Sequence, residues 1–191
     1  MKNNLTIVPL TTSLGAEIRG VNLAELQLED VADFVDLLNL HKVLFFPDQS
    51  LTVDQHVAFG ALFGELQGHP HYENPITKHE QIFELAASHG GVADEWHSDI
   101  SFKPSPALYS ILKMVKCPAI GGDTLWTNPE AAYEALTPPL RALCDGLSAL
   151  HTQKLTVDPR SWRSIPSYEF TPTQGNVAFL LMSISQKGWL K

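Results

Sequence analysis

The residues best suited to chemistry are a histidine and an aspartate two positions apart, in Trp96-His97-Ser98-Asp99. If this segment is an extended strand, His97 and Asp99 project from one face, because strand side chains alternate between faces. An imidazole and a carboxylate on one face supply two ligands of the 2-His-1-carboxylate triad, which holds Fe(II) and leaves positions open for oxygen chemistry. His-x-Asp also occurs by chance as an ordinary hydrogen-bonded surface pair. The spacing alone leaves both interpretations open.

Short strands and amphipathic helices must position this pair. Residues 5–10 and 15–20 are β-rich runs separated by a turn, which predicts an antiparallel pair. Apolar residues recur at helical spacing from Val31 to Leu38, which predicts a helix with one buried face. The apolar run 42–46, closed by a proline, predicts a buried strand.

Further along the chain, helix starts are marked by their capping residues. Thr52 and Gln55 fit a capping box for a helix that ends near Gly64, on which His56 is expected at the surface. Asn128 and Thr137, each followed by proline, start two more helices. Strands are expected over residues 81–85 and 106–115 and in the segment that contains His97 and Asp99. Residues 121–127 are expected to be a turn followed by a strand.

Composition narrows the class of protein. The chain has 191 residues, 44% hydrophobic and 18% charged, which is typical of one soluble globular domain. A net charge of −8 argues against a general nucleic-acid binder. Cys117 and Cys144 are expected to be buried thiols without a disulfide. There is no signal-peptide pattern and no apolar run of bilayer length, so a cytoplasmic protein is expected.

Several blocks taken together resemble one family. These are Trp96-His97-Ser98-Asp99-Ile100-Ser101-Phe102, Gly121-Gly122-Asp123-Thr124-Leu125-Trp126-Thr127-Asn128 and Ala131-Ala132-Tyr133-Glu134-Ala135-Leu136, together with Gly15–Gly20, Val43–Gln49 and Phe63–Leu66. In this order and spacing, the chain over residues 5–152 is similar to the taurine dioxygenase (TauD/TfdA) family of Fe(II)- and 2-oxoglutarate-dependent oxygenases. Residues 1–152 would then be the N-terminal part of such a domain, and residues 153–191 a tail without family resemblance. Within the tail, only 177–182 looks like a core segment.

The resemblance implies a fold and a site. The fold would be a mainly β double-stranded β-helix (jelly roll) with helices packed outside it. His97 and Asp99 would be iron ligands, and Thr124 would hydrogen-bond a carboxylate of 2-oxoglutarate. His69 and Tyr72 would line the substrate pocket. The implied reaction hydroxylates a small organic acid, taurine or another sulfonate, using O₂ and giving succinate and CO₂; no nucleic acid or membrane is expected to take part.

Three features depart from the family pattern. The distal histidine ligand has no counterpart, since His151 aligns with a non-ligand position, and Arg160 and Arg163 lie too early to be the arginine that pairs with 2-oxoglutarate. Family members are also longer, so we expect a jelly roll that is incomplete at its C-terminus, with exposed edges that favour poor solubility or a partner chain, a homo-oligomer included. Ala93 stands where the taurine enzyme has a substrate-contacting asparagine, which leaves another sulfonate, a sulfate ester or a carboxylate equally open.

Two other classes of function compete with the oxygenase. The chain could be a catalytically inactive fragment or interaction module that keeps the N-terminal half of the fold. A cupin-like binding protein would share the barrel, but it would lack the Trp-His-x-Asp and Gly-Gly-Asp-Thr-Leu-Trp blocks. The sequence therefore favours the oxygenase family and leaves the activity of this chain to be tested.

Overall fold

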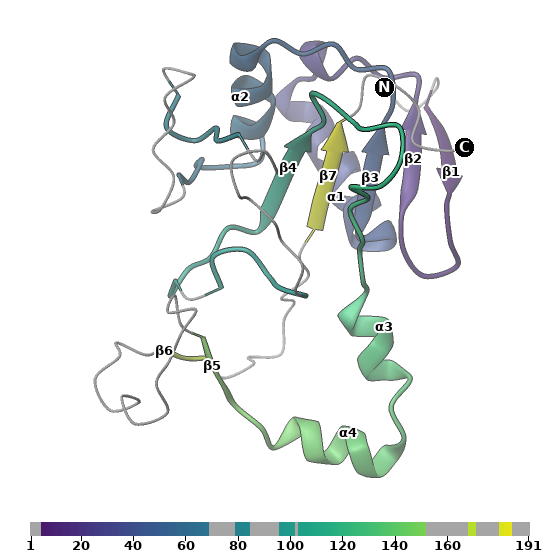
Figure 1. Cartoon of the computed structure of the whole chain (residues 1–191), viewed down its shortest axis with the longest axis vertical. Helices are drawn as coiled ribbons and strands as arrows, with labels where there is room; N and C mark the ends of the chain where they lie inside the picture. The colour runs from purple at the N-terminus through teal and green to yellow at the C-terminus, as the bar shows by residue number, and fades with distance from the viewer. Residues whose placement is uncertain are drawn as a thin grey trace.

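The computed structural model describes residues 5–68, 79–84, 96–101, 103–151, 168–170 and 180–184. These residues form a five-stranded sheet, a separate two-stranded sheet and four α-helices. In the large sheet the strand order is β1 (Thr6–Pro9), β2 (Ala16–Arg19), β3 (Val43–Phe46), β7 (Leu180–Ile184) and β4 (Tyr109–Lys113) (Figure 1). The small sheet pairs β5 (Ala149–His151) with β6 (Tyr168–Phe170).

The large sheet mixes two kinds of pairing. β1 and β2 form the predicted antiparallel pair, with Thr6 opposite Arg19. The pairs β2–β3, β3–β7 and β7–β4 are all parallel. β7 overlaps the end of the predicted core segment 177–182 and lies between two strands that come far earlier in the chain. The prediction of β structure with flanking helices is confirmed, whereas closure into a jelly roll stays a prediction.

Local signals account for the helices. The helix predicted from the apolar stripe is α1 (Val31–His41), which buries Phe34 and Leu38 and contacts β3 and β7. The capping box is present at α2 (Val53–Ala61): the Gln55 N–H donates to Thr52 Oγ1 over 3.2 Å, and the Thr52 N–H donates to Gln55 Oε1 over 2.8 Å.

The two later helices also begin where predicted. At α3 (Pro129–Glu134), Asn128 Oδ1 accepts a hydrogen bond from the Ala131 N–H over 3.0 Å. At α4 (Pro138–Asp145), Thr137 has extended N-cap geometry but makes no side-chain capping bond. Two short 3₁₀ helices, η1 (Leu23–Glu25) and η2 (Leu28–Asp30), lead into α1.

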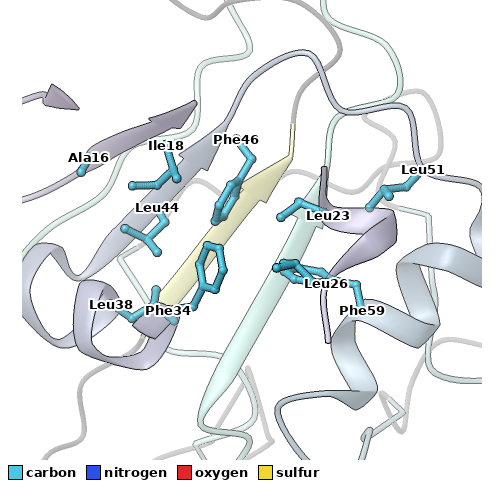
Figure 2. Packing of buried hydrophobic residues seen from close by; sticks show 10 residues of the cluster. All are labelled: Ala16, Ile18, Leu23, Leu26, Phe34, Leu38, Leu44, Phe46, Leu51 and Phe59. Carbon is cyan, nitrogen blue, oxygen red and sulfur yellow. The ribbon is translucent and has the colours of Figure 1, made fainter. Parts of the chain in front are cut away.

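The hydrophobic core lies between the sheet, α1, η1 and α2 (Figure 2). Phe34 of α1 and Phe46 of β3 meet with ring centroids 5.8 Å apart, and both side chains are almost wholly excluded from solvent. Burial of large apolar side chains stabilises the fold by roughly 1.5–3 kcal/mol each. The cluster comprises Ala16, Ile18, Leu23, Leu26, Phe34, Leu38, Leu44, Phe46, Leu51 and Phe59.

One buried polar side chain joins the core elements. Gln49, which follows β3, is 7% exposed. Its Oε1 accepts from the Leu23 N–H over 3.0 Å, and its Nε2 donates to Val21 O over 2.9 Å and to Pro47 O over 3.1 Å. Buried backbone groups need such partners. Gln49 thus ties the start of η1 to the end of β3.

Several predictions are wrong. Residues 81–84 and 123–127 are irregular rather than extended, and Cys117 and Cys144 are both free and exposed rather than buried. A strand forms only against a partner that supplies its hydrogen bonds, and no described strand pairs with these segments. Gly121 and Gly122, at φ +76° and +74°, turn the chain away from an extended path.

α3 and α4 extend away from the sheet (Figure 1). Asn128 Nδ2 donates to Ser13 O over 2.7 Å, and Lys42 forms an ion pair with Glu130 across 2.5 Å, so α3 is tied to the β1–β2 turn and to the end of α1. On α4 and just beyond it, Leu140, Leu143 and Leu147 are exposed at helical spacing. The prediction of a partner chain stays a prediction. None of the helices in the described ranges could cross a bilayer.

Candidate metal centre

The structure brings the side chains of His97 and Asp99 together. His97 Nε2 lies 3.5 Å from Asp99 Oδ1, and each side chain is 55% exposed. Half-exposed groups of this kind are open to water and to a ligand, and an ion pair between them contributes little to stability. The pair therefore contributes little to the stability of the fold, and both side chains are accessible to a ligand.

The two side chains meet through a turn, not through a strand. Residues 96–98 are irregular and 99–101 form a turn, which the Lys103 N–H stabilises by donating to Ile100 O over 3.0 Å. The strand predicted for the segment that contains His97 and Asp99 is thus wrong in the described part of that segment. Ile100 has φ +43°, which is unusual for a β-branched residue. Such a backbone is retained only where surrounding contacts impose it, and it often marks a functional site.

Asp99 has a second partner that the sequence did not indicate. Ser110 Oγ donates a hydrogen bond to Asp99 Oδ2 over 3.1 Å. Ser110 belongs to β4, where its neighbour Tyr109 packs edge-on against Phe63 with ring centroids 5.8 Å apart. The available signal was a serine next to the apolar residues Ile111 and Leu112 of the strand.

The other predicted site residues lie in other parts of the chain. Thr124 is exposed on the irregular segment between β4 and α3. His69 and Tyr72 lie outside the described residues. His151 is in β5. Across the ranges that the structure describes, no group of three histidine, cysteine or acidic side chains is placed to hold a metal ion.

Other histidines have local structural roles. His56, expected at the surface, is instead half-buried against β4. Burial lowers its pKa; a hydrogen bond with the Ile111 backbone opposes that shift, and the nearby charge of Lys113 reinforces it. His79 Nε2 lies 2.6 Å from Asp54 Oδ1, which connects residue 79 to the first turn of α2.

The chain is similar in sequence to known proteins. The family model for "Taurine catabolism dioxygenase TauD, TfdA family" matches residues 6–179. An alpha-ketoglutarate-dependent sulfate ester dioxygenase of Pseudomonas putida is 39% identical over 153 residues, covering 78% of this chain and 50% of that protein. An alkylsulfatase of Acinetobacter baylyi is 38% identical over 152 residues, covering 78% of this chain and 48% of that protein.

The chain is also similar to solved structures. A taurine dioxygenase from Burkholderia xenovorans aligns with a TM-score of 0.63 and 36% identity, over 79% of this chain and 54% of that one. The chain thus spans about half the length of the curated relatives it matches. Family members are 2-oxoglutarate-dependent dioxygenases that use Fe(II), so the predicted cofactors are confirmed for the family. The chain belongs to the TauD/TfdA family of dioxygenases.

Proposed function

We propose that this chain carries the His97–Asp99 part of the iron site of an Fe(II)- and 2-oxoglutarate-dependent dioxygenase. The observation that supports it most strongly is the 3.5 Å approach of His97 Nε2 to Asp99 Oδ1 in a member of this family. Imidazole and carboxylate are ligand types that suit Fe(II) in a facial triad. Residues 1–152 are proposed as the N-terminal part of the dioxygenase domain, in a jelly-roll fold.

The two side chains fit a divalent metal in type and in spacing. Donor atoms about 2.1 Å from a metal and at right angles to each other are about 3 Å apart. The 3.5 Å between His97 Nε2 and Asp99 Oδ1 is close to that value. Both groups are half exposed, so a metal and a chelating ligand can reach them. Two ligands bind more weakly than three, so we expect low affinity in this chain alone.

When bound, iron couples the oxidative decarboxylation of 2-oxoglutarate, which gives succinate and CO₂, to hydroxylation of the substrate. His97 and Asp99 would hold the metal as two of its protein ligands and leave other positions open for 2-oxoglutarate and O₂. By the family resemblance, the hydroxyl of Thr124 would donate a hydrogen bond to a carboxylate of 2-oxoglutarate. By the same resemblance, His69 and Tyr72 would line the pocket that takes the anionic group of the substrate.

We propose a small organic sulfate ester or sulfonate as substrate. The relatives from Pseudomonas putida and Acinetobacter baylyi, named as a sulfate ester dioxygenase and an alkylsulfatase, favour the sulfate ester. A phenoxypropionate dioxygenase of Sphingobium herbicidovorans is 30% identical to this chain. A carboxylate is therefore a third candidate for the anionic group of the substrate. Hydroxylation of the carbon next to the ester oxygen gives an unstable product that releases sulfate.

The second candidate is a non-catalytic module that retains half of the fold. It is favoured by the absence of a third metal ligand beside His97 and Asp99 in the described ranges. The two proposals differ in one measurable property, because only the first predicts turnover.

Turnover is tested with the full chain, Fe(II), 2-oxoglutarate and a short alkyl sulfate, with succinate and free sulfate measured together. The matched alkyl sulfonate and alkyl carboxylate test the substrate class. The enzyme proposal predicts substrate-dependent succinate that is lost in Asp99→Asn. Succinate no higher than in that variant would leave the non-catalytic module as the better account.

A further inference from the structure

We propose that Ser110 is a positioning residue for the metal site, holding Asp99 so that one carboxylate oxygen faces the metal. Its Oγ donates to Asp99 Oδ2 over 3.1 Å, whereas Oδ1 is the oxygen 3.5 Å from His97 Nε2. The two oxygens of one carboxylate thus have different partners. This inference rests on the proposed function, because it assumes that His97 and Asp99 bind metal.

Ser110 can position another group because β4 is itself held firmly. Side chains alternate along a strand, so Tyr109 and Ile111 face the opposite side from Ser110. Both pack against the hydrophobic core, and Tyr109 also stacks edge-on with Phe63. At the end of β4, Lys113 Nζ donates a hydrogen bond to Leu51 O. The hydroxyl therefore projects from a strand whose flanking residues are fixed by packing.

Asp99, by contrast, needs an external constraint. It lies in a turn and is 55% exposed, and the next residue has the unusual φ of +43°. A free aspartate side chain rotates about χ1 and χ2, and its two oxygens exchange places with respect to a metal. A hydroxyl bond to Oδ2 leaves Oδ1 as the single ligand atom, which fixes one-oxygen coordination and the distance to His97.

The expected effect follows from the general role of groups behind metal ligands. Hydrogen-bond partners of metal-ligating side chains typically change metal affinity by about 10–100-fold when removed. The Ser110–Asp99 bond is exposed to solvent, where water partly replaces a lost donor. We therefore expect the low end of that range, roughly 10-fold.

The test uses the full chain and Co(II), a spectroscopic substitute for Fe(II), titrated by calorimetry and by visible absorption. Ser110→Ala removes the hydroxyl, Ser110→Thr keeps it on a β-branched side chain suited to a strand, and Ser105→Ala is the matched control at an exposed serine of the preceding segment. Thermal unfolding of the metal-free variants shows whether each is folded.

Ser110→Ala should bind Co(II) roughly 10-fold more weakly than wild type and should change the absorption of the bound ion. Ser110→Thr and Ser105→Ala should match wild type. Equal affinity and spectrum in wild type and Ser110→Ala would overturn the positioning role and leave the proposed function intact. No Co(II) binding by wild type would overturn both. Equal weakening in Ser110→Ala and Ser110→Thr would also overturn it, because loss of the hydroxyl would not be the cause.

Discussion

The replacement of Gln49 by leucine tests how the N-terminal core is held. Gln49→Leu keeps a side chain of similar size, but it removes the partner of one backbone N–H and two carbonyls, those of Leu23, Val21 and Pro47. An ordinary hydrogen bond contributes about 1 kcal/mol net, and a buried group left without a partner costs about 1–3 kcal/mol. The bonds to Leu23 and Pro47 are buried, while the one to Val21 is partly buried and can be replaced by water.

These values predict a net loss of about 3 kcal/mol in the free energy of unfolding, after a small gain from the apolar leucine. Urea unfolding followed by far-UV circular dichroism measures that loss from the midpoint and slope. The matched control is Gln81→Leu at an exposed glutamine, which should change stability by less than about 0.5 kcal/mol. A loss below about 1 kcal/mol in Gln49→Leu, with an unchanged slope, would refute the reasoning.

Three further predictions concern other elements. Thr52→Ala should cost about 1 kcal/mol by removing the cap of α2, whereas Thr137→Ala should cost much less, because Thr137 makes no side-chain capping bond; urea midpoints compare the two. His56 has a pKa below its ordinary 6.5 in the folded state, so the unfolded state takes up protons first and wild type should lose stability as the pH falls below about 6.5; equal pH dependence in wild type and His56→Gln would contradict this. Phe46→Ala should lower the free energy of unfolding by about 3–5 kcal/mol, because Phe46 is fully buried. Leu125→Ala, at an exposed residue, should lower it by less than about 0.5 kcal/mol.

The sequence was informative where structure is local. The apolar stripe beginning at Val31 predicted α1, and the capping-box pattern of Thr52 and Gln55 predicted the start of α2. Asn128 before a proline likewise predicted the start of α3. Each signal lies within one or two helical turns, so it can be recognised without knowledge of the partners in the fold.

Features that depend on distant partners were not predictable in the same way. The segments around Asp99 and Thr124 have strand-like composition, yet no described strand pairs with them, and they are irregular. β7 enters the sheet between β3 and β4, a placement that nothing in its own residues specifies. The bond from Ser110 to Asp99 joins a core-packed strand to a turn that lies 11 residues earlier in the chain. The local His-x-Asp pattern left two interpretations of His97 and Asp99 open, and the family resemblance favoured the metal site.

The central claim, that His97 and Asp99 form part of an iron site, is tested most directly by anaerobic titration of the chain with Fe(II) and 2-oxoglutarate. Chelation of iron by the 2-oxoacid at a protein site gives a visible charge-transfer band. Wild type should develop this band, and Asp99→Asn and His97→Ala should not. Absence of the band in wild type, or its persistence in both variants, would contradict the claim.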